Sequence, residues 1–388
     1  MTALTVEKIG SLEALLVLER EWRGLESASR SGLPFLTFDW CMAWWKHLRE
    51  DKLGIRDTLF VHLLRSPAGD LVAVAPLMLT RRPAFGPFCI RHLQFFGADP
   101  NITEVRGILA LPDRHLDAHR VLLAHLRERS GDWDTLTLSG VPKEGELSNL
   151  VNGAYPNAEW TKETPDFVLT LAPTWDEFKG KLSRNIKESL RKCYNSLKRD
   201  GHEFSLEVTS TRGEAASALD RFFFLHQARA ELSGTVNHRN VFDASMARRF
   251  LTDVCERFAD RGALRIFTLR ISGKIAAVRV GFVLGDSLYL YYSGYDPEFG
   301  KYSVMTTAVA EAIKYAIEQR FATVNLSTGN DVSKTRWSPA EVVFRQASIV
   351  SPSRRGELTH QVYSRARKAV ESAPLRSVAA RFLARRTE

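Results

Sequence analysis

The chain contains 388 residues, of which 44% are hydrophobic and 10% aromatic, and it carries a formal net charge of +9. This length and composition are typical of a globular protein with two domains and a substantial buried core. No stretch approaches the ~20 consecutive apolar residues of a transmembrane helix, and residues 1–16 lack the basic start and apolar run of a secretory signal. The four cysteines are widely spaced, which predicts no metal site and a reducing, cytoplasmic compartment.

The positive charge is concentrated in two segments. Residues 179–201 contain eight Lys and Arg residues against two acidic residues, and residues 352–388 contain nine against three. The rest of the chain is therefore slightly acidic, so the basic segments predict contacts with anionic partners. The C-terminal segment also places Val378, Phe382 and Leu383 on one face of an expected helix. We interpret it either as a solvated tail or as a peripheral membrane contact.

The first part of the chain predicts a mixed α/β unit. Apolar spacing indicates helices, and alternating apolar residues on both sides of the Pro67–Asp70 turn indicate an antiparallel hairpin. In chain order we expect helices at 11–25 and 39–48, the hairpin at 59–79, strands at 90–96 and 104–109, a helix at 114–129 and a strand at 134–140.

A long basic helix is expected next. Thr174 and Glu177 form a capping box, in which each side chain accepts a hydrogen bond from a backbone N–H of the first turn. Apolar residues recur at helical spacing from 182 to 197 and leave Lys and Arg residues on the opposite face. The sequence therefore predicts one amphipathic helix over 174–200.

The last part of the chain repeats the order of the first. It predicts a hairpin at 264–284, a strand at 287–295, a helix at 303–319 and a strand at 322–329. The segments LFVHLLR and DTLTLSG of the first unit match LRIFTLR and TVNLSTG of the second. We therefore expect an α/β (α+β) protein with related domains at 1–160 and 161–350, followed by a basic, partly helical tail at 351–388.

The junction between the strand at 287–295 and the helix at 303–319 is suited to an anionic ligand. A helix N-terminus presents unpaired backbone N–H groups and the positive end of the helix dipole. The five residues at this junction are Gly300, Lys301, Tyr302, Ser303 and Val304. We predict that they form a phosphate cradle; the alternative is that Ser303 is an ordinary helix cap.

Several motifs resemble a known family. They are LSRNIKESLRKCYNSLKRDG, FFFLHQARAEL, YYSGYDPEFGKYS and LSTGNDVSKTRW in the second unit, and PFLTFDWCMAWW with LFVHLLRSPAGDLVAVAPL in the first. Through these motifs the chain, nearly as far as Trp337, resembles the bacterial GNAT-superfamily acyltransferases of the CelD type. Those proteins are associated with cellulose and exopolysaccharide biosynthesis and are related to the FemABX transferases.

The resemblance implies two tandem GNAT-like domains, each a twisted mixed sheet flanked by helices. It also implies transfer of an acyl group from acetyl-coenzyme A or another acyl-coenzyme A to an amine or hydroxyl, with a small molecule or a glycan precursor as acceptor. The strand around Ser293 and Gly294 is then expected to bind the pantetheine arm and the thioester oxygen. The helix N-terminus at Ser303 is expected to hold the pyrophosphate.

Acyl transfer also needs a base that deprotonates the acceptor. Asp331, just after the last strand, and His226, in the helix FFFLHQARAEL, are the candidates. The alternatives are a loop cap for Asp331 and a packed core residue for His226. Lys334, Arg336 and Trp337 are expected to bind an acidic substrate or the phosphates of the donor, unless they form a basic loop over a packed indole.

Three functions compete. The first is the acyltransferase. The second is an aminoacyl-tRNA-dependent transferase of the FemABX kind, in which the basic helix would hold RNA phosphates, although residues 201–337 contain no long coiled-coil insertion of the sort those proteins carry. The third is a non-catalytic module that keeps the GNAT fold, because Tyr302–Met305 replaces the Tyr-Ser-Pro-Gly that relatives often have.

Overall fold

The computed structural model describes residues 4–86, 89–99, 101–232 and 239–371. The elements of the first half are β1 (Thr5–Ile9), α1 (Leu12–Val17), α2 (Glu19–Ser29), α3 (Phe38–His47), β2 (Asp51–Lys52), β3 (Ile55–Leu59), β4 (Val61–Arg65), β5 (Leu71–Ala75), β6 (Leu77–Arg82), β7 (Ile90–Phe95), β8 (Leu109–Ala110), α4 (His115–Glu128), β9 (Thr135–Pro142) and α5 (Glu146–Ala154).

The second half contains β10 (Glu159–Thr170), α6 (Trp175–Lys181), α7 (Arg184–Arg199), β11 (Phe204–Thr209), α8 (Arg212–Ala230), α9 (Ser245–Asp260), β12 (Leu264–Ile271), β13 (Lys274–Leu284), β14 (Ser287–Tyr295), α10 (Val304–Glu318), β15 (Thr323–Thr328), α11 (Val332–Thr335), β16 (Ala340–Val350) and α12 (Arg354–Glu371).

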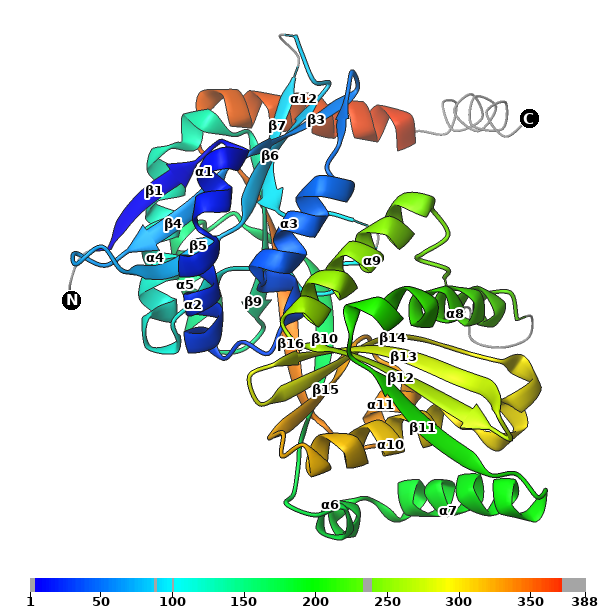
Figure 1. Ribbon diagram of the computed structural model, residues 1–388. Coiled ribbons are helices and arrows are strands. Elements are labelled where there is room, and N and C mark those ends of the chain that lie inside the picture. The colour runs from blue at the N-terminus through cyan, green and yellow to red at the C-terminus, as the bar shows by residue number, and fades with distance from the viewer. Residues whose placement is uncertain (1–3, 87–88, 100, 233–238, 372–388) are drawn as a thin grey trace.

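Two sheets organise the molecule. A twelve-stranded mixed sheet has the order β11-β12-β13-β14-β15-β10-β16-β9-β7-β6-β3-β2, and a four-stranded antiparallel sheet has the order β1-β4-β5-β8. In the second half, α8 and α9 cover one face of the large sheet, and α10 with α7 covers the other (Figure 1). Twisted mixed sheets flanked by helices confirm the expected fold class.

The predicted βαβ repeat is present in both halves. β7 and β9 are parallel and are connected through α4, just as β14 and β15 are parallel and connected through α10. Both expected hairpins also form, as β4–β5 and β12–β13. The repeated order in the sequence therefore corresponds to a repeated supersecondary unit.

The two halves share the large sheet. β10 pairs with β15 on one side and with β16 on the other, and β16 in turn pairs with β9. The domain boundary expected between residues 160 and 161 falls near the start of β10. The C-terminal strand β16 thus returns to the first half and joins the two repeats through backbone hydrogen bonds.

Some element predictions were wrong. The strand expected at 104–109 is reduced to the two residues of β8, because the preceding segment crosses the ends of other strands instead of pairing with one. The helix expected at 11–25 is interrupted at Leu18. The helix expected over 174–200 is broken at the extended residues Leu182 and Ser183, so that α6 and α7 can both bury apolar side chains in one cluster.

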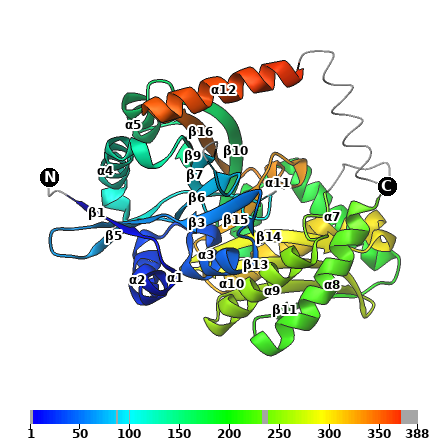
Figure 2. The ribbon, with the colours of Figure 1, turned by 90° about the horizontal axis from the view of Figure 1, so that it is seen from above.

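The ends of the chain are described only in part. The tail is helical in α12, which packs against β16 on the side of the first half (Figure 2). Val378, Phe382 and Leu383, the expected amphipathic face, lie outside the described residues. Among the residues that are described, no helix is long and apolar enough to cross a membrane.

An aromatic cluster centred on Trp40 of α3 also joins the halves. The indole is 1% exposed and lies edge-on to Phe250 of α9, Phe282 of β13 and Tyr291 of β14, with ring centroids 5.2 to 6.1 Å apart. Its Nε1–H donates to Thr103 Oγ1 at 3.2 Å. Edge-on pairs of buried aromatic rings stabilise a core beyond their area burial, so this cluster fixes α3 and the Thr103 segment against β14.

We expect Trp40→Ala to lower the free energy of unfolding by about 3–5 kcal/mol, because it leaves a cavity between the halves and removes the hydrogen bond to Thr103. Urea unfolding followed by circular dichroism would measure the loss. Val17→Ala, at a side chain that is 81% exposed, is the control and should change stability by less than about 0.5 kcal/mol. Equal effects of the two substitutions would contradict the central role of Trp40.

Candidate functional site

The site begins where β14 and β15 separate. Their parallel pairing extends only from Ser287 with Thr323 to Tyr289 with Asn325. β14 continues to Tyr295 and there pairs, among the described strands, only with β13; an irregularity between Arg279 and Gly281 of β13 shifts the register of this pair. Bulges of this kind redirect side chains next to functional sites. Beyond Tyr289, the edge of β14 that faces β15 is therefore left without a partner strand.

A cavity of about 410 Å³ occupies this opening. Its walls come from β13, β14, β15 and the first turn of α10, and also from β9, β10, β16 and the 99–106 segment of the first half. The volume is within the usual range for small-molecule sites. Seven Lys and Arg residues line it against three Asp and Glu residues, so the cavity favours an anionic ligand.

The equivalent opening in the first repeat is filled. β7 and β9 pair over only three residues before they separate, but Arg106 and Gly107 pack against Gly140 of β9 just beyond that point. A Cβ on Gly140, whose φ is +76°, would lie 2.1 Å from the Arg106 carbonyl oxygen. A Cβ on Gly97, at φ +84°, would lie 2.4 Å from the Thr103 side chain. Only glycine permits these contacts, and they close the first opening.

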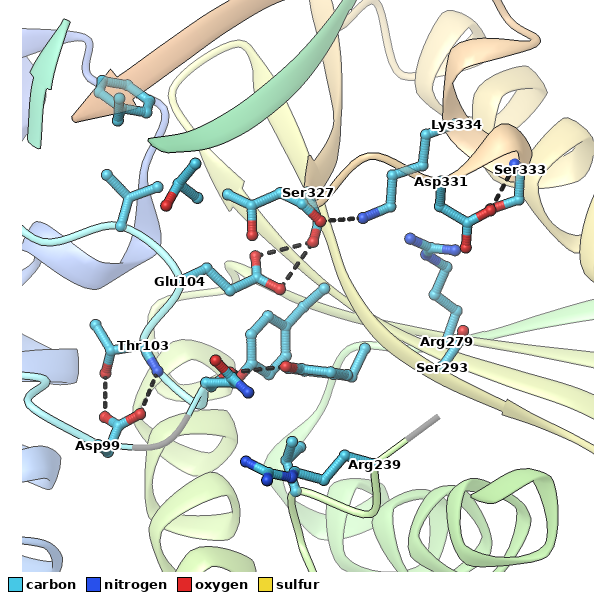
Figure 3. A pocket seen from close by; sticks show the side chains of 18 of the residues that line it. Asp99, Thr103, Glu104, Arg239, Arg279, Ser293, Ser327, Asp331, Ser333 and Lys334 are labelled. Atoms are coloured by element: carbon cyan, nitrogen blue, oxygen red, sulfur yellow. Dashed lines mark hydrogen bonds between the residues drawn. The ribbon is translucent and has the colours of Figure 1, made fainter. Parts of the chain in front are cut away.

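The same segment delivers Glu104 into the second opening. Its carboxylate accepts a hydrogen bond from Ser327 Oγ at 2.8 Å (Figure 3). It accepts another from Tyr289 Oη at 2.5 Å. Burial raises the pKa of Glu104, although the Lys334 ammonium and these hydroxyl donors act to lower it. A carboxyl group from the first half thus lies between the separated strands of the second, with the elevated pKa of a candidate proton acceptor.

A second buried carboxylate supports this arrangement. Asp166 of β10 is 3% exposed, and one of its oxygens accepts a hydrogen bond from Asn325 Nδ2 at 2.8 Å. The other oxygen is buried without a partner among the described residues. Burial, reinforced by the nearby charge of Glu104, raises the pKa of Asp166 to about 6 despite the hydrogen bond from Asn325.

The structure places five of the predicted site residues on the cavity. They are Ser293, His226, Asp331, Lys334 and Trp337. Gly294 does not line it but lies behind β14, where a Cβ would be 2.4 Å from the backbone nitrogen of His226; this contact allows α8 to approach the strand. Arg336 does not line it either, because its guanidinium donates to Ser189 of α7.

The two candidate bases differ in environment. Asp331 caps α11 and accepts a hydrogen bond from the Ser333 backbone N–H at 2.8 Å. Burial opposes its ionisation, but the hydrogen bonds of Ser333 and the charge of Lys334 together lower its pKa, which makes it a weak base. His226 is buried, and its Nδ1 lies 3.0 Å from the Ser293 carbonyl oxygen, so the ring supports β14 beside the opening.

The predicted phosphate cradle lies outside the cavity. Tyr302 and Val304 are buried in a hydrophobic cluster, and Gly300, Lys301 and Ser303 are exposed. Ser303, at φ +53°, adopts a left-handed conformation and makes no side-chain cap bond. The first turn of α10 instead faces the cavity through Met305 and Thr306. The helix N-terminus therefore adjoins the cavity, through the two residues that directly follow the five predicted ones.

Sequence reasoning missed three cavity residues with strong chemistry. They are Glu104, Arg229 and Arg279. Glu104 was assigned to a strand, although the preceding Asp99–Pro100 pair is a turn signal and loops often carry functional residues. Arg279 lies within an apolar strand, where a buried charge is itself an unusual feature. In the described part of the chain, no group of three or more His, Cys, Asp or Glu side chains could hold a metal ion.

Residues 184–335 match the family model described as an acetyltransferase (GNAT) domain. This GNAT-matching region contains α7 through α11, and therefore both the separated strands β14 and β15 and the helix α10 between them. It excludes β10, β16 and the whole first half. No curated protein matches the chain.

Solved structures are similar over most of the chain. The crystal structure of FemX is 11% identical, with a TM-score of 0.56 over 87% of this chain and 96% of FemX. L-PGS from Bacillus licheniformis is 14% identical, with a TM-score of 0.49 over 92% and 97%. A tandem GNAT protein from the clavulanic acid biosynthesis pathway is 14% identical, with a TM-score of 0.45 over 89% and 98%. At 11% identity, the similarity to FemX shows the fold alone. Together with the family match, it indicates a GNAT-type transferase fold.

The buried carboxylate of Asp166 predicts a pH-dependent stability. A carboxyl whose pKa rises on folding stabilises the protein below its unfolded pKa, and this contribution is lost as the pH rises through the folded value of about 6. Asp166→Asn removes that loss while keeping an acceptor for Asn325. We expect the variant to gain up to about 3 kcal/mol over the native protein at pH 8 and about half of that at pH 5, measured by urea unfolding.

Asp134→Asn is the matched control for this comparison. Burial opposes ionisation of Asp134, but the hydrogen bonds of Arg91 and the charges of Arg91 and Arg355 together lower its pKa. Asp134 is therefore ionised at both pH 5 and pH 8, and the variant should lose the same free energy at the two pH values. A gain for Asp166→Asn that does not change with pH would contradict the assigned titration.

Proposed function

We propose that the protein is an acyltransferase that moves an acetyl or other acyl group from acyl-coenzyme A to an amine or hydroxyl acceptor. The observation that carries this proposal is the separation of β14 from β15 after Tyr289, with α10 beginning at one side of the opening and a buried carboxylate inside it. The match of residues 184–335 to an acetyltransferase domain supports the same chemistry. The resemblance to CelD-type proteins favours a sugar or exopolysaccharide precursor as acceptor.

The donor is assigned to the edge of β14 and to the start of α10. Beyond Tyr289 the backbone of β14 has free hydrogen-bonding capacity for an extended polar chain such as pantetheine. The phosphates are assigned to the N-terminal turn of α10, near Thr306 and the exposed Lys301, where backbone N–H groups and the helix dipole favour negative charge. The thioester then lies near Ser293, beside Glu104.

Glu104 is assigned as the general base. In the transfer, a bond forms between the acceptor nitrogen or oxygen and the acyl carbon, and the bond from that carbon to sulfur breaks. The acceptor proton passes to Glu104, and the thiolate takes a proton from solvent. A backbone N–H of β14 near Ser293 stabilises the negative charge on the acyl oxygen. Asp331, with its lowered pKa, orders the loop before Lys334 rather than accepting the proton.

Aminoacyl-tRNA-dependent transfer is the second candidate function. The observation that favours it is the exposed basic face of α7, which carries Arg191 and Lys192 on the outside of the second half. Such a face suits contacts with RNA phosphates. The fold shared with FemX is compatible with this function. Salt-sensitive binding of tRNA that is lost in a variant with both residues changed to Ala would favour it over the first candidate.

Binding of the donor tests the first proposal directly. Millimolar acetyl-coenzyme A should raise the melting temperature by a few degrees, because a ligand that binds only the folded state stabilises it. Thr306→Glu should abolish the shift by placing a carboxylate at the α10 N-terminus. Met246→Glu, which adds the same charge at the start of α9, is the control and should keep it. No shift with the native protein would count against an acyl-coenzyme A donor.

Glu104→Gln tests the assigned base. With an acceptor in hand, we expect turnover to fall by about 10²–10⁴-fold, the usual contribution of a general base, while acetyl-coenzyme A still stabilises the fold. Since the pKa of Glu104 is raised, the acid limb of the native pH profile should lie above the range of an ordinary carboxyl group and vanish in the variant. An unchanged acid limb would exclude Glu104 as the base.

A further inference from the structure

Arg279 is a buried cation without a matching anion. Its side chain projects from β13 into the cavity and is only 8% exposed (Figure 3). One Nη2–H donates to the Leu290 carbonyl oxygen at 3.3 Å. Its Nε is buried and has no hydrogen-bond partner in the described part of the chain. The guanidinium forms no ion pair with any described carboxylate, since none lies within 4.0 Å.

Such a group destabilises the folded state. A buried charge that is neither paired nor fully hydrogen-bonded opposes folding by several kcal/mol. Burial, together with the nearby charge of Arg229, lowers the pKa of Arg279 to about 10, so the guanidinium still carries its charge at neutral pH. Its unsatisfied donors therefore remain available to a ligand that enters the cavity.

The charges around Arg279 leave one positive charge in excess. Arg229 and Lys334 line the same cavity, and Glu104 and Asp331 are the acidic groups that face them. Both carboxylates are already engaged, Glu104 by the Tyr289 and Ser327 hydroxyls and Asp331 by the Ser333 backbone N–H. An anionic ligand that binds beside Arg279 would offset this excess, in a cavity whose lining is positive as a whole.

We propose that Arg279 binds a carboxylate of the substrate beside the reacting centre. A guanidinium presents parallel N–H donors that match the two oxygens of a carboxylate. Arg279 lies directly opposite Ser293 in the β13–β14 register, so a carboxylate bound there lies next to the position assigned to the thioester. The role of this carboxylate in a substrate rests on the proposed acyl transfer. The binding of a carboxylate by Arg279 can be tested without it.

Two sources can supply the carboxylate. It belongs either to the acyl chain of the donor, as in a dicarboxylic acyl thioester, or to the acceptor, as in an amino acid. The phosphates of the donor do not supply the anion for Arg279, because they are assigned to the α10 N-terminus. The first turn of that helix faces the cavity through Met305 and Thr306.

The binding test uses malonate as a probe and malonamide as its uncharged match. Malonate should raise the melting temperature of the native protein, and malonamide should not. Arg279→Met should abolish the shift and, because it removes an unpaired buried charge, should melt no lower than the native protein without ligand. Arg279→Lys keeps the charge but loses the parallel N–H donors of the guanidinium, so malonate should raise the melting temperature of this variant by a smaller amount.

Two matched pairs then distinguish the sources. Succinyl-coenzyme A is compared with butyryl-coenzyme A for the donor, and glycine with glycinamide for the acceptor, by calorimetry on the native protein and on Arg279→Met. The carboxylate member of one pair should bind about 10- to 100-fold more tightly to the native protein, a range typical of hydrogen bonds to charged groups, and the preference should vanish in the variant.

The outcomes separate this inference from the proposed function. If malonate stabilises the native protein but not Arg279→Met while no acyl-coenzyme A binds, the carboxylate site stands and the acyltransferase proposal fails. If acetyl-coenzyme A binds but malonate stabilises both proteins equally, or neither, and neither pair discriminates, the carboxylate site is overturned and the acyltransferase proposal stands.

Discussion

The separation of β14 from β15 after three residue pairs is the constraint on which the rest of the site depends. A parallel pair that continued to the end of both strands would satisfy the backbone groups of β14 and leave no space between them. The bulge next to the Arg279–Ser293 pair and the close approach of α8 at Gly294 both lie on the part of β14 that diverges from β15. The cavity thus exists because β14 and β15 separate, and its charged groups surround the edge of β14 that is left without β15.

Three charged groups at this edge of β14 lower the stability of the fold. Asp166 and Arg279 are buried and Glu104 is partly buried, and the loss of water contact opposes the charged form of each. Their partners are mostly neutral hydroxyl, amide and carbonyl groups. The close packing of the aromatic cluster around Trp40 stabilises the fold near the site and offsets this loss of stability. A polar site kept partly unsatisfied inside a well-packed support is the arrangement expected of a binding site rather than of a structural core.

Local patterns in the sequence carried much of the fold and part of the site. The hairpins and the strand–helix–strand order of both repeats follow from apolar alternation and helical spacing, and Ser293, Asp331 and Lys334 lie on the cavity beside the strand ends. The sharing of β16 with the first half could not be foreseen, because strand pairing across 200 residues leaves no local signal. Glu104 was missed for the same reason, since its role depends on a segment of one repeat reaching into the other.

The contact between the Arg106 carbonyl oxygen and Gly140 has a consequence for how the cavity is built. The segment that makes this contact also carries Glu104, which accepts a hydrogen bond from Ser327 of β15. The region that matches an acetyltransferase domain, 184–335, contains neither this segment nor β9, β10 and β16, whose residues also line the cavity. The walls of the cavity therefore belong to both halves, and the matching region alone supplies only one side of them.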